Sequence, residues 1–501
     1  MTEADKSLKG SFKKSVGWTF LARGGIVLVT VGGGAVLARL LTPEQFGIVA
    51  AAKLFTGIAT RFGNLGFGMS LIQRKEITPD HVSTLFTSMV ATHGSICLLL
   101  MGIGYFLGGV IDKNPMVGNV LCVMALDFAL MPFSTVSTCL LQRKMGFKCI
   151  SVASFLDHVS SAVLAIILAF AGLGVWSLAI GSVGASLVGT IVMMVGAGFW
   201  PRIKFVPQAM KELSRYGIWM MLGNLMNYAK ENVDYLIVWR QLGHAQLGLY
   251  EKAFRLMDVT VKEFTKKIGG VLFAAFTKIH EDRGRFRAAY RKVNLVQSLI
   301  VYPLTLGMLV TAPPLVVVVY GPKWEPSIAP LQILCLAAIF RMNSSSINAA
   351  LYSSGAVKGA ALQRIANLIL MTAGCIFGAR WGIEGVAAAV LATNVLLAIG
   401  LAFVAMQKDL LRLSDLTVSQ LPALFGSGVM VAALIPYSWW GGEAFGPHSA
   451  VLLLTEVCIG AILYPVAVLV LRNRMVSEMV REFGGDALRA VKRLSPRKVK
   501  T

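Results

Sequence analysis

The chain has 501 residues, of which 56% are hydrophobic and only 14% are charged, and its mean hydropathy is +0.69. This balance excludes a water-soluble globular protein, because a soluble core cannot hide so much apolar surface. Apolar stretches of about 20 residues, the length that crosses a bilayer, recur almost from end to end. The composition therefore predicts an all-α polytopic membrane protein.

The apolar stretches predict about 14 transmembrane helices. In chain order these helices are expected at residues 15–38, 45–70, 83–111, 115–141, 149–171, 174–198, 216–239, 246–277, 293–320, 327–353, 361–379, 382–406, 417–438 and 449–471.

The formal net charge is +22, from 47 Lys and Arg against 25 Asp and Glu. If the first helix enters from the cytoplasm, most basic residues fall in cytoplasmic tails and loops. By the positive-inside rule, this distribution predicts both termini in the cytoplasm, and it accounts for the basic excess without nucleic acid. The basic tail at residues 491–501 is expected to contact anionic lipid heads. The predicted outer loops hold only Arg39, Lys113, Arg240, Lys323 and Arg380.

Motifs for covalent or nucleotide-driven chemistry are absent from the sequence. No Gly-Lys dipeptide of a Walker loop occurs, and neither the six His nor the seven Cys have metal-ligand spacing. The Cys are therefore interpreted as small packing residues within helices. We expect no metal, no cofactor and no enzymatic activity.

The chain contains an internal repeat. Residues 39–47 read Arg-Leu-Leu-Thr-Pro-Glu-Gln-Phe-Gly, and residues 240–248 read Arg-Gln-Leu-Gly-His-Ala-Gln-Leu-Gly. Four identities between them are each 201 residues apart, as are Trp18 and Trp219, whereas a later Gly-Val pair recurs after 211 residues. The longer offset places an insertion in the charged connection at 278–292. Duplication of this kind is typical of transporters that alternate access between two halves.

The predicted organisation follows from that repeat. Two parallel six-helix repeats occupy residues 1–205 and 206–410, and residues 411–501 add two transmembrane helices and a basic tail.

Charged residues inside the predicted helices are the main functional signal. Each costs roughly 2.5–3.5 kcal/mol at mid-bilayer, so it must face protein or water. Basic residues outnumber acidic ones among the charges of the first, second, seventh and eighth helices, which favours an anionic substrate in a central cavity. The candidate substrate-binding cations are Arg23, Lys53, Arg61, Lys230, Arg255, Lys262 and Arg341.

An alternative interpretation is that these charges are internal ion pairs that hold helices together. In the eighth helix Glu251 and Arg255, Asp258 and Lys262, and Glu263 and Lys267 have the spacing of such pairs.

Several acidic residues are candidates for coupling transport to a proton or a cation. Two of them stand in otherwise apolar helices of the first repeat, and the alternative is a hydrogen-bonded structural carboxyl. The coupling candidates are Asp127, Asp157, Glu231, Asp234 and Asp258.

Several short motifs occur along the chain at residues 38–47 (Ala-Arg-Leu-Leu-Thr-Pro-Glu-Gln-Phe-Gly), 71–75 (Leu-Ile-Gln-Arg-Lys), 78–81 (Thr-Pro-Asp-His), 141–143 with 147–148, 273–290 and 320–326 (Tyr-Gly-Pro-Lys-Trp-Glu-Pro). These motifs resemble the polysaccharide transporter family, the Wzx-type flippases of the multidrug/oligosaccharidyl-lipid/polysaccharide (MOP) superfamily. The resemblance covers roughly residues 10–410.

The resemblance implies a V-shaped pair of six-helix bundles in the bacterial inner membrane. Such a protein moves a polyprenyl-diphosphate-linked oligosaccharide from the inner to the outer leaflet, and its protein partners are a polysaccharide polymerase and a chain-length regulator. A multidrug extruder of the same superfamily and a membrane glycan polymerase or ligase are the alternatives. The cations that the resemblance assigns to the diphosphate are Arg23, Lys53, Arg61, Arg255 and Lys262.

Overall fold

The computed structural model describes residues 24–63, 71–72, 74, 76–108, 115–208, 217–279, 282–353 and 357–471. These ranges form helices and connecting loops without a β-strand. The helices up to residue 208 are Gly24–Leu40, α2 (Pro43–Gly63), α4 (Pro79–Phe106), α5 (Met116–Arg143), α6 (Phe147–Phe170) and α7 (Val175–Ala197).

The remaining helices include two short 3₁₀ turns. They are α9 (Gly217–Ile279), α10 (Arg283–Tyr320), η2 (Pro322–Ser327), α11 (Ile328–Ser353), α12 (Val357–Gly378), η3 (Ala379–Trp381), α13 (Gly382–Gln407), α14 (Leu413–Thr417), α15 (Leu421–Phe445) and α16 (Ala450–Val470). Within the described ranges, ten helical segments are long and apolar enough to cross a membrane. The all-α membrane class is thus confirmed, whereas the layout of 14 spans in two repeats stays a prediction.

The helices fall into two compact units. Unit 1 comprises Met1–Lys252, Val319–Trp324 and Met371–Val386, and unit 2 comprises Ala253–Val318, Glu325–Leu370 and Ala387–Thr501. The predicted repeat boundaries near residues 205 and 410 concern the sequence repeat and not these compact units, and they remain a prediction.

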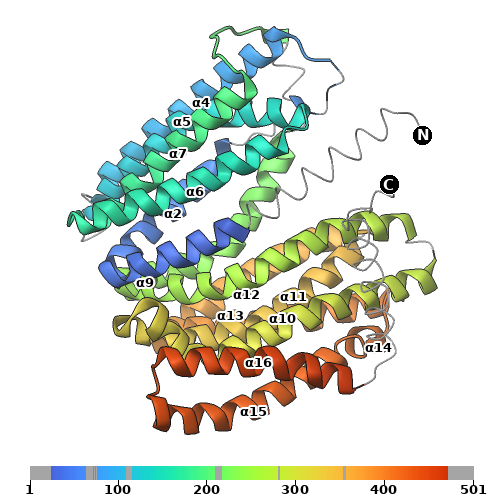
Figure 1. The fold of residues 1–501 in the computed structure, drawn as a ribbon. Helices are drawn as coiled ribbons and strands as arrows, with labels where there is room; N and C mark the ends of the chain where they lie inside the picture. The colour runs from blue at the N-terminus through green and yellow to red at the C-terminus, as the bar shows by residue number, and fades with distance from the viewer. Residues whose placement is uncertain are drawn as a thin grey trace, which may run out of the picture. The chain divides into compact units, whose positions relative to one another are not determined.

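Unit 1 contains a tight helix cluster of α4, α5, α6 and α7 (Figure 1). Phe86 of α4 packs edge-on against Phe133 and Phe199, with ring centroids 5.0 and 5.6 Å apart. A Cβ at Gly181 of α7 would lie 3.0 Å from the Ala165 Cβ of α6. This close approach fits the role of small residues in membrane helix packing.

Helix α10 of unit 2 begins at Arg283, so the polar connection expected at 278–292 is largely helical. Phe286 and Tyr290 are one helical turn apart and buried, and the Phe286 ring packs on other apolar residues of unit 2. On the adjacent face of the helix, Arg287 Nη2 lies 2.6 Å from Asp409 Oδ1, and Arg291 Nε lies 3.4 Å from Asp415 Oδ1. The expectation of a polar connection at 278–292 was therefore wrong. The arginines of this segment pair with acidic residues about 120 positions later in the sequence, so the segment can form a helix.

The two spans expected at 216–239 and 246–277 are both helical, and the label α9 covers the pair. A kink at Gly243 separates the two helices, since its φ of 85° and ψ of −178° are not helical. A positive φ of this size favours glycine, which has no Cβ to clash with the backbone. The expected loop between the two spans is therefore reduced to a break at one glycine.

Helix α4 begins earlier than expected because the motif at residues 78–81 caps it. The His81 N–H donates to Thr78 Oγ1 at 3.4 Å, and the Thr78 N–H donates to His81 Nδ1 at 3.1 Å. This reciprocal capping box satisfies two backbone donors at the helix start.

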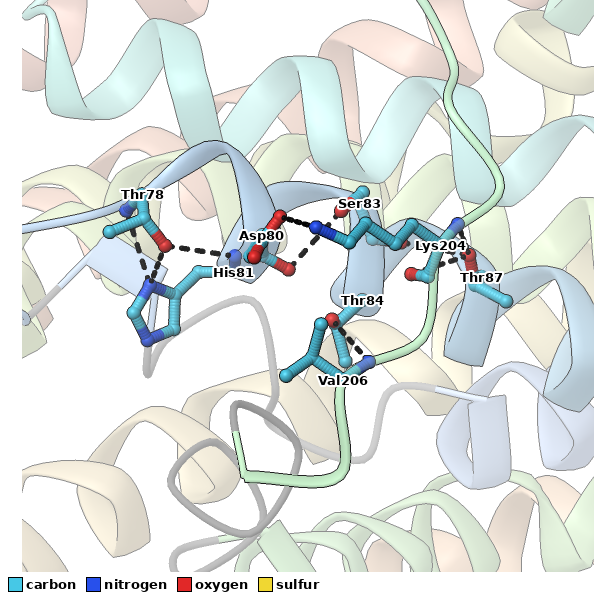
Figure 2. Close-up of polar contacts among 8 residues, drawn as sticks. All are labelled: Thr78, Asp80, His81, Ser83, Thr84, Thr87, Lys204 and Val206. Atoms are coloured by element: carbon cyan, nitrogen blue, oxygen red, sulfur yellow. Dashed lines mark hydrogen bonds and ion pairs between the residues drawn. The ribbon is translucent and has the colours of Figure 1, made fainter.

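The chain that follows α7 lies against the first turns of α4 (Figure 2). Lys204 Nζ contacts Asp80 Oδ1 at 2.6 Å, and both ends of this ion pair are solvent-exposed. The Lys204 N–H donates to Thr87 Oγ1 and the Val206 N–H donates to Thr84 Oγ1, each at 3.1 Å. Hydroxyls of one helix thus hold the backbone of this connecting segment.

Thr84→Val is expected to lower the melting temperature of the detergent-purified protein more than Lys204→Gln does. The first change leaves the half-buried Val206 N–H without its acceptor, which costs about 1–3 kcal/mol. The second removes an exposed ion pair, and such pairs contribute about 0–1 kcal/mol. A larger loss in the Lys204 variant would contradict this ranking.

Candidate functional site

Two predicted substrate-binding cations lie on one helix of unit 1. Lys53 and Arg61 are both on α2, eight residues apart, with Lys53 exposed and Arg61 half-buried. The Arg61 Cζ lies 5.3 Å from the centroid of the Tyr228 ring of α9. Among the described residues no carboxylate forms an ion pair with Arg61, so this guanidinium is held by a ring face.

Arg341 of α11 is held differently, within unit 2. Its Nη2 lies 2.7 Å from Asp258 Oδ1 of α9, and its Cζ lies 5.6 Å from the Phe254 ring centroid. A predicted cation and a predicted coupling carboxylate therefore neutralise each other. The nearby Arg255 side chain is exposed.

The charged candidates of the first part of α9 differ in their exposure. Glu231 is exposed and Lys230 is half-buried. Asp234 is instead 1% exposed and accepts a 2.9 Å hydrogen bond from the Tyr250 hydroxyl. This contact gives Asp234 a packing partner inside unit 1.

Two candidate residues cannot be placed. Arg23 lies outside the described residues, and at Lys262 the structure describes the α9 backbone without the side chain.

The coupling candidates Asp127 of α5 and Asp157 of α6 both lie in unit 1, and both side chains are half-buried. A Cβ added to Gly189 of α7 would lie 3.3 Å from Asp157 Oδ1, so this carboxyl packs against α7. His158 Nδ1 lies 3.5 Å from Asp157 Oδ2 and 2.8 Å from the Ser154 carbonyl, to which it donates. A half-buried carboxyl beside a histidine can bind and release a proton, which is the chemistry that coupling requires.

The two repeated sequence segments contact each other in unit 1. A Cβ added to Gly47 would overlap the His244 carbonyl oxygen, and one added to Gly248 would overlap the Pro43 carbonyl oxygen. The relation is reciprocal, since each glycine lies against the backbone of the other segment. Two glycines at matching positions of the repeat are therefore required by close helix packing.

Next to this contact lies Lys252, a buried cation that the sequence did not single out as a site residue. Its side chain is only 4% exposed. The ammonium lies 3.7 Å from the Phe46 ring centroid, 5.2 Å from that of Tyr320 and 5.7 Å from that of Trp324. The Trp324 Nε1–H also donates to the Ala38 carbonyl at 2.9 Å.

The signal for this arrangement was present in the motifs at residues 38–47 and 320–326. Each supplies one or two of the rings around the ammonium, and Lys252 follows the second glycine of the repeat by one helical turn. The contacting residues of the two motifs are 286 positions apart, so no local pattern in the sequence predicts that the motifs contact each other. These motifs therefore build a packing junction, not the surroundings of Arg61.

The chain matches the family described as "Polysaccharide biosynthesis protein" over residues 36–329. It is 27% identical over 364 residues to the lipopolysaccharide biosynthesis protein WzxC of Escherichia coli (strain K12), covering 71% of this chain and 72% of that protein. It is 25% identical over 480 residues to the succinoglycan biosynthesis transport protein ExoT of Rhizobium meliloti (strain 1021), covering 93% and 94%.

Solved structures share the fold at low identity. The lipid II flippase MurJ in an inward closed conformation has a TM-score of 0.71 and 13% identity, with 93% of this chain and 99% of that chain covered. An inward-facing multidrug resistance MATE transporter of the MOP superfamily has a TM-score of 0.58 and 16% identity, with 82% and 95% covered. The family match spans more than half of the chain and confirms the resemblance seen in its motifs: the chain belongs to the polysaccharide biosynthesis protein family, among the Wzx-type transporters of the MOP superfamily.

Proposed function

We propose that this protein translocates a polyprenyl-diphosphate-linked oligosaccharide repeat unit across the bacterial inner membrane by alternating access. The glycan would serve the synthesis of exopolysaccharide, capsule or O-antigen. The proposal extends to this chain what the names of ExoT, a succinoglycan biosynthesis transport protein, and MurJ, a lipid II flippase, say of those proteins.

The observation that carries the proposal is the state of Arg61. Its guanidinium is half-buried on a membrane helix and rests on a tyrosine ring, with no carboxylate paired to it among the described residues. A planar guanidinium on a ring face keeps its N–H edge for two parallel hydrogen bonds to a phosphate. An anionic head group is the ligand that such a cation fits.

The other predicted cations differ in how well they suit a phosphate contact. Lys53 is on the same helix as Arg61 and would be a second contact for the diphosphate, whereas Arg341 is already neutralised by Asp258. Lys230 and Arg255 are the further cations with described side chains.

The predicted orientation places both termini in the cytoplasm, which is supported by the basic residues in the predicted inner loops. In that orientation the substrate enters from the leaflet where basic loops gather. A polysaccharide polymerase and a chain-length regulator are the protein partners that we propose.

The two alternative functions find less support. A multidrug extruder requires a site for organic cations, and an arginine with no carboxylate partner among the described residues disfavours cationic ligands. A glycan polymerase or ligase would be a catalyst, whereas the full-length relative ExoT is named as a transport protein.

Arg61→Ala should weaken binding of undecaprenyl diphosphate to the detergent-purified protein by roughly 10- to 100-fold, because it removes charge-assisted hydrogen bonds. Native mass spectrometry during a ligand titration measures the dissociation constant. Arg240→Ala is the matched control, since Arg240 also stacks on an aromatic ring of unit 1, that of Trp239, but is exposed. Equal affinity of the Arg61 variant and the wild-type protein would contradict the proposed site.

Asp157→Asn should abolish the dependence of glycan-lipid translocation on a proton gradient in proteoliposomes. The change keeps the side-chain shape and removes a half-buried carboxylate that packs against α7. Asp80→Asn, which alters an exposed carboxylate of α4, is the control and should retain the wild-type dependence. If Asp157→Asn transports at the wild-type rate with the wild-type gradient dependence, this carboxyl has no coupling role.

A further inference from the structure

The ring under Arg61 belongs to a tyrosine that is fitted into α2. A Cβ added to Gly57 of α2 would overlap the Tyr228 hydroxyl, so the ring can lie against this helix only because residue 57 is glycine. The Tyr228 hydroxyl donates toward the Lys53 carbonyl at 3.2 Å and the Leu54 carbonyl at 3.1 Å. The hydroxyl end of the Tyr228 ring is thereby fixed on α2, whereas its backbone belongs to α9.

The spacing along α2 places Arg61 next to that ring. Leu54, Gly57 and Arg61 follow each other at intervals of three and four residues, so they share one face of the helix. Side chains of a helix lean toward its N-terminus. The Arg61 side chain therefore extends back over the turn where Tyr228 is held, which accounts for the 5.3 Å between its Cζ and the ring centroid.

Holding the guanidinium in this way has a consequence for ligand binding. A free arginine side chain loses rotamer freedom when it binds a phosphate, and that loss weakens the affinity. A ring that already restricts the side chain removes part of this cost and leaves the N–H edge accessible to a ligand.

We propose that Tyr228 is a positioning residue that orients Arg61 for the substrate diphosphate. Its ring end occupies the space beside Gly57 that a larger side chain would fill. The inference rests on the proposed function, because it assigns a role to Tyr228 only through Arg61. Tyr228 itself is not assigned a contact with the substrate.

A double-mutant cycle tests the inference, with undecaprenyl diphosphate as the probe and its dissociation constant as the readout. Tyr228→Leu should weaken binding about 3- to 20-fold in the wild-type background and should have no further effect in Arg61→Ala. Tyr228→Phe retains the ring and should restore most of the affinity. Phe55→Leu is the matched control and should not change it, because Phe55 of α2 packs on Trp239.

A second pair of variants tests whether the space at Gly57 is required. Gly57→Ala should weaken binding as Tyr228→Leu does, because the added methyl group displaces the hydroxyl. In the Tyr228→Leu background the same Gly57→Ala change should have no effect, since the overlapping atom is gone. Elution volume and melting temperature check that each variant is folded.

The outcomes separate the two proposals. If Arg61→Ala leaves the dissociation constant unchanged, the proposed substrate contact fails. If Arg61→Ala weakens binding but Tyr228→Leu does not, the positioning role fails alone. Equal losses from Tyr228→Leu in both backgrounds would also overturn it, because the tyrosine would then act independently of Arg61.

Discussion

A charged side chain on a membrane helix costs roughly 2.5–3.5 kcal/mol unless protein or water surrounds it, and the described charges of this protein meet that constraint in different ways. Arg341 is neutralised by Asp258, Asp234 accepts a hydrogen bond from a tyrosine, and Lys252 is surrounded by three aromatic rings. Arg61 rests on one ring, with no carboxylate paired to it among the described residues. The first three arrangements satisfy the charge internally, whereas the fourth is the one that we propose for an anionic ligand.

The fold class was predictable because the thickness of the bilayer sets the length of each apolar stretch. Element boundaries were less predictable where partners distant in the sequence decide them. Helix α10 extends to Arg283 because Arg287 and Arg291 meet acidic residues about 120 positions later, and a local pattern of charge looks like a loop. The two expected spans of α9 are separated by a single residue, Gly243, whose non-helical conformation marks the kink between the two helices.

The candidate site was predictable as a list of charges but not as a set of contacts. Asp258 and Arg341 are 83 residues apart, and no local spacing indicates that they pair. Two of the motifs that indicate the family, at residues 38–47 and 320–326, meet around Lys252, while Arg61 lies outside all of them. This separation explains how the motifs could indicate the family without indicating a substrate site. The contact of Tyr228 with α2 was likewise not predictable from local sequence, since it depends on a glycine of another helix.

The most direct test of the proposed function is leaflet exchange of a fluorescent glycan linked to polyprenyl diphosphate, measured in vesicles that contain the purified protein. Reduction of the fluorophore by a membrane-impermeant reagent reports how much substrate has reached the outer leaflet. We expect rapid exchange that requires the protein, and slower exchange of the same glycan on a polyprenyl monophosphate, because the second phosphate supplies part of the charge that we propose Arg61 to bind. Exchange no faster than in protein-free vesicles, or equal rates for both lipids, would contradict the account.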